Sequence, residues 1–219
     1  ILIFKIGLIF MNKELENILE KVGELYKKYG IKSVTMDDVS RELGISKKTL
    51  YQHVENKSEL VAKVLDYILV KNHCQITDLI EQDLNAVEEL LAVGVHIIKM
   101  VKDQNPSTEY DLKKYYPDLF KKLHETRKER MYDSVLKNIL KGKKEGLFRD
   151  DLDDEIIAKM QTSRFMNMGH DEFFNPEEMF KPRYILELFI YHIRGVANSK
   201  GIEVLEKTLE KNDIKEYLQ

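Results

Sequence analysis

Three helix-start signals lie close together near the N-terminus, and their spacing strongly restricts what this part of the chain can fold into. Thr35, Ser46 and Asn56 are residue types whose side-chain oxygen accepts a hydrogen bond from the free backbone N–H groups of a first helical turn. Asp38 and Glu59 follow Thr35 and Asn56 at the capping-box spacing. Because each helix must end before the next one begins, the sequence predicts two short helices and then a longer one.

The two short helices are separated by a turn that contains glycine. Met36, Val39 and Leu43 have the spacing of an inward-facing side of the first helix. Gly44 follows, and glycine readily adopts the positive φ that a sharp turn after a helix requires. The pattern therefore predicts a helix, a tight turn and a second helix within a short stretch of chain.

The second short helix has one apolar side and one polar side. Leu50 and Val54 are its candidate buried residues, and Ser46 is its N-cap. Short polar side chains near its start leave the backbone N–H groups free to approach phosphate. Its outward positions carry polar, basic or hydroxyl-bearing side chains: Lys47, Lys48, Thr49, Tyr51, Gln52 and His53. This arrangement is typical of a helix-turn-helix whose second helix enters the major groove of DNA.

Helical periodicity continues through the rest of the 219 residues. Strand-like alternation and hairpin signals are not found, and the four prolines lie between the periodic segments. The sequence therefore predicts an all-α fold, with an N-terminal three-helix DNA-binding domain over residues 11–57 and a larger helical domain over residues 58–219. Helices outside the motif are expected at about 11–29, 57–80, 85–103, 107–116, 117–144, 152–169, 182–199 and 200–212.

The chain opens with a largely apolar stretch of ten residues, ILIFKIGLIF, which is too short for a membrane span of about 20 residues. We expect residues 1–10 to be a non-native or upstream-derived extension, because Met11 begins a well-patterned helix and is the expected natural start. Cys74, the only cysteine, is expected to be a small buried residue, and no intrachain disulfide can form. These features predict a cytoplasmic protein with no membrane association.

Residues 34–60, VTMDDVSRELGISKKTLYQHVENKSEL, resemble the DNA-binding segment of the tetracycline-repressor (TetR) family. The most specific part begins at Gly44 and ends at Lys57, and it is similar to the family's G-hydrophobic-S-x-x-x-L-Y-x-H-[FV]-x-x-K pattern. The detailed resemblance covers roughly residues 12–65, and beyond it only the number and layout of the helices agree. The resemblance implies a homodimeric transcriptional regulator that binds a near-palindromic operator in double-stranded DNA.

The resemblance also implies roles for individual residues. Positions that commonly contact the DNA backbone in the family are Thr35, Thr49, Tyr51, His53 and Lys57. Lys47, Lys48 and Gln52 lie where base contacts vary between members. An aromatic residue is common at the position of Gln52, so this residue departs from the pattern, although glutamine can pair with adenine. From the residues alone, the two lysines can also be a solvated face, His53 a packed structural histidine and Tyr51 a spacer between helices.

The resemblance also implies that the larger domain forms the dimer, through helices near 152–169 and 182–199 that pair with their copies in a four-helix interface. The second of these helices carries a wide apolar face and, beside it, a second apolar strip made of Leu186, Ile190 and Ala197. Two strips are more than a single core contact requires, which favours a partner surface. An interior helix of a monomer is the alternative interpretation.

The resemblance further implies a pocket in the larger domain for a small, hydrophobic effector whose binding moves the long helix that begins near Lys57. The candidate lining residues are large or deformable side chains and two histidines: His96, Met100, Tyr110, Phe120, Met131, Met160, Phe165, Met166 and His170. From the residues alone, each of them can equally be an ordinary core residue.

Net charge and sequence motifs help to decide between a DNA-binding regulator and an enzyme. The formal net charge is −3, so DNA binding must come from a local surface rather than from an overall basic field. Phosphate-binding loops, zinc-binding helices and serine-nucleophile motifs are not found, so no cofactor, no metal site and no enzymatic activity is predicted. The predicted function is a repressor released from its operator by a ligand. The alternatives are a helix-turn-helix protein regulated by a protein partner without a small-molecule effector and, more distantly, a helical enzyme.

Overall fold

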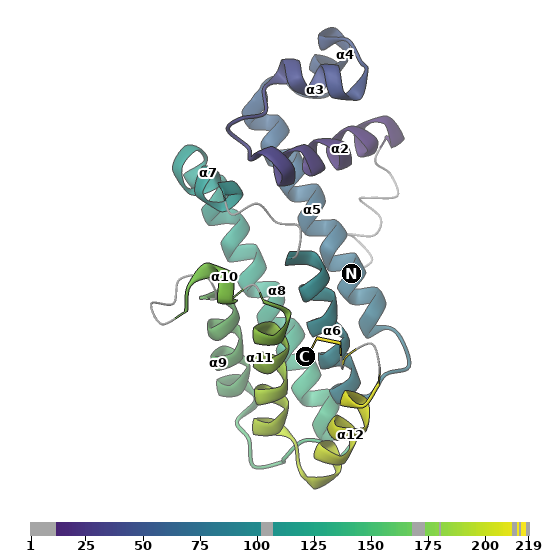
Figure 1. Ribbon diagram of the computed structural model, residues 1–219. Helices are drawn as coiled ribbons and strands as arrows, with labels where there is room; N and C mark the ends of the chain where they lie inside the picture. Colours follow the sequence, from purple (N-terminus) through teal and green to yellow (C-terminus); the bar gives the residue numbers. More distant parts are fainter. Residues whose placement is uncertain are drawn as a thin grey trace. The chain divides into compact units, whose positions relative to one another are not determined.

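The computed structural model describes residues 12–101, 107–167, 174–179, 181–211, 214 and 216–217. Over these residues the chain is all α, as predicted (Figure 1). No strand forms among them, and an isolated antiparallel bridge pairs Phe148 with Ala197. None of the described helices combines the length and the hydrophobicity that crossing a bilayer requires. The expected extension at residues 1–10, the expected start Met11 and the candidate pocket residue His170 lie outside the described residues.

The helices begin and end close to their predicted positions. Pro117 and Pro182 each begin a helix, where the N–H group that proline lacks would have no partner inside the helix. A four-residue helix, α10, is not among the predicted helices. The bounds are α2 (Lys13–Tyr29), α3 (Met36–Leu43), α4 (Lys47–His53), α5 (Lys57–Ile80), α6 (Ala86–Val101), α7 (Ser107–Tyr115), α8 (Pro117–Lys144), α9 (Asp154–Met166), α10 (Pro176–Met179), α11 (Pro182–Val196) and α12 (Ser199–Leu209).

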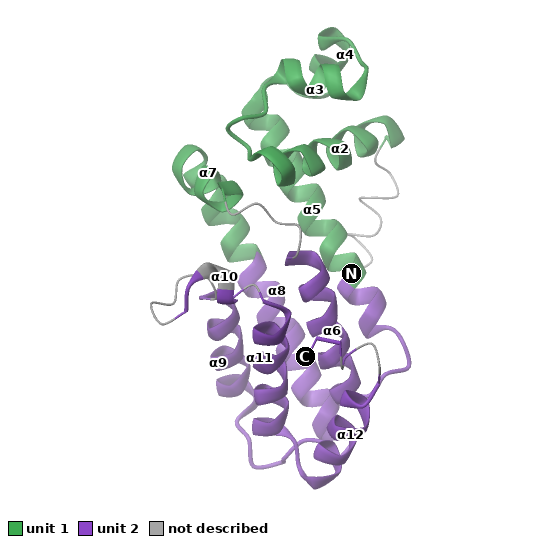
Figure 2. Cartoon of the chain, in the orientation of Figure 1, with its two compact units in different colours: residues 1–75, 103–126 green, residues 76–102, 127–219 purple. Residues whose placement is uncertain are grey.

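The chain forms two compact units (Figure 2). Unit 1 contains residues 1–75 and 103–126, and unit 2 contains residues 76–102 and 127–219. The division falls within α5 and within α8, while the boundary expected near residue 57 coincides with the first residue of α5. Each unit has a hydrophobic core of its own.

The core of unit 1 is formed by the apolar sides of its short helices and of α5. Leu19 and Val22 of α2 are buried, as are Leu50 of α4 and Val61 of α5. Leu112 of α7 belongs to the same core, although it follows the helix-turn-helix by many residues. The segment around α7 is therefore part of the structure that supports the helix-turn-helix.

Two hydrogen bonds fix α7 against the last turn of α2 and the loop that follows it. The Asp111 carboxylate accepts a hydrogen bond from the backbone N–H of Lys32 at 2.8 Å. The Thr108 hydroxyl donates to the backbone carbonyl of Tyr26 at 3.3 Å. Gly30 permits this close approach, because its φ is +79° and a Cβ on it would lie 2.6 Å from a hydroxyl oxygen of α7.

Unit 2 is built around α11, which packs against α6 and α12. Where α6 meets α11, a Cβ on Gly94 would lie 3.0 Å from the ring of Phe189. Leu186, Ile190 and Ala197, the second apolar strip of α11, are buried in the core of the same unit. The interpretation of this strip as surplus surface for a partner is therefore wrong, because helices of the same chain cover it.

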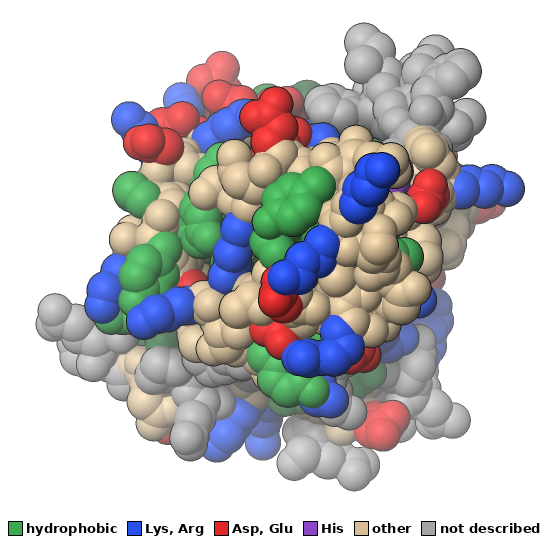
Figure 3. Space-filling model, turned by 90° about the horizontal axis from the view of Figure 1, so that it is seen from above, with side chains coloured by type: hydrophobic (Ala, Val, Ile, Leu, Met, Phe, Trp, Pro, Cys, Tyr) green, Lys and Arg blue, Asp and Glu red, His purple; other side chains and the backbone are tan. Residues whose placement is uncertain are grey.

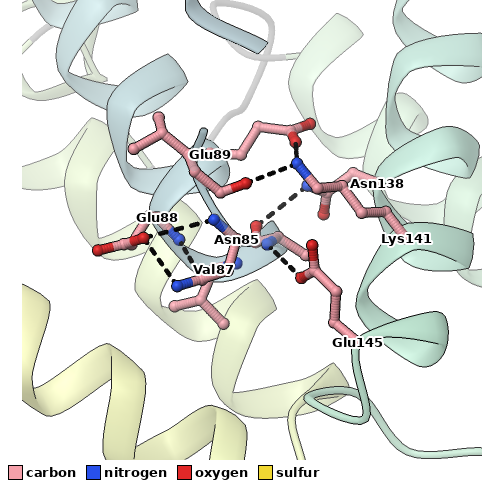
Figure 4. Close-up of polar contacts among 9 residues, drawn as sticks. Asn85, Val87, Glu88, Glu89, Asn138, Lys141 and Glu145 are labelled. Atoms are coloured by element: carbon pink, nitrogen blue, oxygen red, sulfur yellow. Dashed lines mark hydrogen bonds and ion pairs between the residues drawn. The ribbon is translucent and has the colours of Figure 1, made fainter. Parts of the chain in front are cut away.

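A polar network joins the start of α6 to α8 (Figure 4). The Asn85 side chain accepts hydrogen bonds from the backbone N–H groups of Val87 and Glu88, both at 3.1 Å. The Lys141 ammonium lies 2.7 Å from the carboxylate of Glu89, whose side chain is only 5% exposed. Lys141 also donates to a backbone carbonyl just before α6 at 2.7 Å. A carboxylate buried to this degree requires its cation in place, because an unpaired buried charge is costly.

We expect Lys141→Met to destabilise the protein by about 3–5 kcal/mol, because it leaves the Glu89 carboxylate buried without a cation. Urea-induced unfolding of the purified chain measures the change in the free energy of unfolding. The double variant Lys141→Met/Glu89→Met is the matched control, and it should recover most of the lost stability because both charges are gone. A single variant as stable as the parent would contradict the assignment.

Candidate nucleic-acid interface

Helix α4 begins with a well-formed N-cap after a tight turn. The Ser46 Oγ accepts a hydrogen bond from the Thr49 backbone N–H at 3.0 Å, and the two hydroxyl oxygens lie 2.8 Å apart. Gly44 has a φ of +66°, and a Cβ on it would meet no atom within 4 Å. The left-handed backbone conformation, and not a lack of space, therefore favours glycine in this turn.

Helix α4 has one side in the core of unit 1 and one side in solvent. Leu50 is fully buried and Val54 is 2% exposed. Tyr51, the neighbour of Leu50 in the sequence, is 48% exposed, and Lys48 and Gln52 are exposed as well. This confirms the two-sided helix that the sequence predicts.

The start of α3 is held by a reciprocal capping box. The Asp38 backbone N–H donates to the Thr35 hydroxyl oxygen at 3.2 Å, and the Thr35 backbone N–H donates to the Asp38 carboxylate at 2.9 Å. The hydrogen bonds from Thr35 lower the pKa of the Asp38 carboxyl below its ordinary value. Thr35 is exposed, so the capping box fixes it at the surface.

Lys57, the first residue of α5, reaches back to the loop before α3. Its ammonium group donates to the backbone carbonyl of Lys32 at 3.1 Å. Burial lowers the pKa of Lys57, and the charges of Asp111 and Asp38 act in the opposite direction. The side chain is half-buried, so it is not sealed inside unit 1.

The other predicted contact residues differ in how their side chains are engaged. Lys47 forms an ion pair with Asp37 at 2.7 Å, and the Nε2 of His53 lies 3.6 Å from the Glu14 carboxylate. Three exposed side chains make no hydrogen bond or ion pair with the part of the chain that the structure describes: Lys48, Tyr51 and Gln52. Figure 3 views unit 1 from the end that carries α3 and α4, and basic and acidic side chains are interspersed over this face.

The candidate pocket residues are divided between the two units. In unit 1, Tyr110 is exposed and Phe120 packs against the core. In unit 2, Met160 is 63% exposed on α9, and the ring centre of Phe165 lies 4.9 Å from that of Phe189. The other described candidates in unit 2 are half-buried: His96, Met100, Met131 and Met166.

Lys32 and Asp111 also take part in this region, although no sequence motif assigns them a role. Lys32 accepts from Lys57 through its carbonyl and donates to Asp111 through its N–H group. A lysine shortly before the Thr35 cap is a local signal that could have drawn attention to Lys32. No local signal points to Asp111, which lies 79 residues further along the chain.

Residues 18–64, which extend from within α2 into α5, match the family described as "Bacterial regulatory proteins, tetR family". Over this segment the chain is similar to the TetR family. TetR-family regulators bind operator DNA and act as dimers. The buried Leu50 and the exposed Tyr51 of α4 lie inside the matched segment.

Individual relatives extend the likeness beyond the helix-turn-helix. The uncharacterized HTH-type transcriptional regulator YvaF of Bacillus subtilis is 30% identical to this chain over 104 residues. These residues are 47% of this chain and 54% of YvaF, so the match spans about half of that relative. The HTH-type transcriptional repressor KstR2 of Mycobacterium tuberculosis is 24% identical over 157 residues, 68% of this chain and 76% of KstR2. A protein of Saccharomonospora viridis, solved in complex with choline, has the same fold with a TM-score of 0.59 and 20% identity, over 85% of this chain and all of the other.

We expect Tyr51→Ala to weaken DNA binding for every operator variant, whereas Gln52→Ala should change the preference at one or two base pairs by about 1–3 kcal/mol each. The dissociation constants for a duplex selected by the parent and for its single-base variants measure both effects. Gln75→Ala, at an exposed glutamine of α5 in the same unit, is the matched control and should bind as the parent does. Folded variants that all bind like the parent would remove α4 from the interface.

Proposed function

We propose that this chain is a transcriptional repressor that binds a near-palindromic operator as a homodimer and leaves it when a small, largely hydrophobic ligand binds. The main support for DNA binding is that α4 has one buried side and one exposed side, with Leu50 fully buried and Tyr51 48% exposed. A helix held from behind by apolar side chains can place its polar side in a major groove. The direction of regulation is supported by the likeness to KstR2, which is named a repressor.

The predicted contact residues divide by their surroundings. Thr35, Ser46 and Lys57 lie at helix starts and are held by hydrogen bonds, which suits fixed contacts to phosphates. Lys48 and Gln52, in contrast, project freely, which suits base edges. The roles of the other contact residues follow the resemblance to the family's pattern. We assign backbone contacts to Thr35, Ser46, Thr49, Tyr51, His53 and Lys57. We assign contacts to base edges to Lys47, Lys48 and Gln52.

We place the homodimer interface on α9 and α11. Ile156 and Met160 of α9 are 54% and 63% exposed, and Tyr191 of α11 is 68% exposed. The Arg164 guanidinium lies 4.8 Å from the centre of the Tyr191 ring, so residues of both helices share this face. Large apolar side chains grouped in solvent are typical of a surface that another molecule covers. In a twofold dimer this face meets its own copy, and two recognition helices roughly 34–36 Å apart reach successive major grooves.

Buried polar atoms in unit 2 support an effector site there. The Nε2 of His192, the Oγ1 of Thr162 and the Nε2 of Gln161 are buried and have no hydrogen-bond partner among the described residues. Burial lowers the pKa of His192 to about 4, so its imidazole is neutral near pH 7. Unpaired buried polar atoms cost free energy until a partner satisfies them. We therefore propose an effector that is mostly apolar and carries one or two hydrogen-bonding groups.

The choline complex of the Saccharomonospora viridis protein supports a small-molecule site within this fold. The alternative is a DNA-binding regulator controlled by a protein partner, and the effector experiment below separates the two. A helical enzyme has no support from the relatives, which are regulators.

Selection of bound duplexes from a random DNA pool tests the proposed function directly. We expect a near-palindromic consensus whose affinity for the protein falls as salt concentration rises, because phosphate contacts release counterions. A folded chain that enriches no sequence would contradict the proposal.

The double variant Met160→Glu/Tyr191→Glu should be a folded monomer, because it places four carboxylates in a twofold interface. Sedimentation or light scattering gives the mass, and operator affinity should fall because one recognition helix alone binds weakly. Ser199→Glu introduces the same type of side chain at an exposed position of α12 and should leave the mass of the parent unchanged. A double variant that keeps the parent's mass would move the interface elsewhere.

An effector should raise the melting temperature of the parent, since a ligand at about 100 times its Kd stabilises the folded state by about 2.7 kcal/mol. A thermal-shift panel of small amphiphiles, with choline among them, tests this. Thr162→Val removes the unpaired hydroxyl at nearly constant volume, so it should reduce the shift caused by any hit. A panel in which no compound stabilises the parent would favour the alternative without a small-molecule effector.

A further inference from the structure

Two lysines and two tyrosines form a continuous exposed surface beside the helix-turn-helix. The Lys114 ammonium lies 5.2 Å from the ring centre of Tyr110 and 5.6 Å from that of Tyr115. The Lys32 ammonium lies 5.0 Å from the Tyr115 ring centre. Tyr110 and Tyr115 are 57% and 39% exposed. We call Lys32, Tyr110, Lys114 and Tyr115 the lysine–tyrosine patch. In Figure 3, where tyrosine is coloured as hydrophobic, green and blue side chains lie next to each other over α7, at the left of the view.

The chemistry of the patch suits an anion. The Lys114 ammonium donates to the Tyr110 hydroxyl oxygen at 2.9 Å, which leaves the hydroxyl proton of Tyr110 available for another acceptor. Hydrogen bonding to tyrosine raises the pKa of Lys114 and of Lys32, so both are charged at neutral pH. The patch therefore offers two cations and phenolic donors on one surface.

The patch is connected to the predicted DNA contacts by hydrogen bonds. Lys57, a predicted phosphate contact, donates to the carbonyl of Lys32 at 3.1 Å. Asp111 of α7 accepts from the N–H of Lys32 at 2.8 Å. Asp111 is itself only 6% exposed, so its carboxylate is not part of the exposed surface of the patch. The other carboxylate of this helix segment, Glu109, pairs with Lys113 at 2.9 Å.

We propose that the DNA-binding surface continues from the helix-turn-helix onto α7, where the lysine–tyrosine patch binds phosphates of the DNA backbone next to those contacted by Lys57. This inference rests on the proposed function. The patch lies on α7 and the loop before α3 and not on the recognition helix, so we assign its ammonium and phenol groups to phosphates, and it adds affinity without sequence preference. The chain has a net charge of −3, and Lys47 on the recognition helix already forms an ion pair with Asp37. Among the described residues, few other cations are therefore free to contact phosphates near the recognition helix, and Lys32 and Lys114 supply a large share of these contacts.

The test is the salt dependence of operator affinity for Lys32→Ala/Lys114→Ala, measured on a duplex selected by the parent. The slope of the logarithm of affinity against the logarithm of salt concentration should be shallower by about 4, because each protomer of the bound dimer loses two lysine–phosphate contacts and each contact contributes about 1. Affinity at about 0.15 M salt should fall roughly threefold to tenfold, with unchanged base preference. Lys121→Ala/Lys122→Ala is the matched control, since it removes the same charge from exposed positions of α8 in unit 1.

The outcomes separate this inference from the proposed function. A parent that binds its operator, together with a patch variant whose slope equals the parent's, overturns the inference and leaves the proposed function intact. Equal losses of operator affinity in the patch variant and in the control also overturn the inference, because the effect then comes from the overall charge of the protein. A folded parent that selects no duplex overturns both. Tyr110→Phe/Tyr115→Phe keeps both cations and both rings, so it should weaken binding with little change in the slope.

Discussion

The recognition surface depends on the burial of Leu50 and Val54. Helix α4 has seven residues, far fewer than the roughly 12–15 that an isolated helix needs to be even marginally stable in water. It forms because Ser46 caps its start and the two apolar side chains anchor it in the core of unit 1. The polar side of α4 contributes little to folding, so its residues are free to serve recognition.

Several cations around the helix-turn-helix are held by local contacts and do not form one basic field. Lys47 pairs with Asp37, Arg41 pairs with Asp38, and Lys57 donates to a backbone carbonyl. These contacts fix where the cations lie, but they also offset part of their charge. Because screening limits surface electrostatics to about 8–10 Å at physiological salt, affinity for DNA must come from cations that lie next to the phosphates. This is the physical reason for the importance of further cations beside the helix-turn-helix.

Features with local signals were predictable from the sequence, and features that depend on distant segments were not. The caps at Thr35 and Ser46 and the turn at Gly44 are confirmed, because each depends on neighbouring residues. The hydrogen bond between Lys32 and Asp111 joins segments 79 residues apart, and neither residue lies in a recognisable motif. The second apolar strip of α11 was misinterpreted for a related reason: periodicity indicates that a strip is covered, but not whether the same chain or a partner covers it. Exposure in the folded chain moves the candidate interface to residues of α9 and to another side of α11.

Unit 2 contains two kinds of buried polar group, and the difference bears on where a ligand can act. Glu89 is matched by Lys141, so this pair is satisfied by the fold itself. Thr162 and His192 present buried atoms without partners among the described residues, so they are a cost that a bound molecule can remove. A ligand shifts a conformational equilibrium only by its difference in affinity for the two states. Polar atoms that form hydrogen bonds only with the ligand can supply that difference in affinity. An apolar molecule packed near Phe165 without a hydrogen-bonding group would leave these atoms unpaired, and their free-energy cost would remain. Specificity for the effector is therefore expected to come from these few polar atoms, and its affinity from the apolar surface around them.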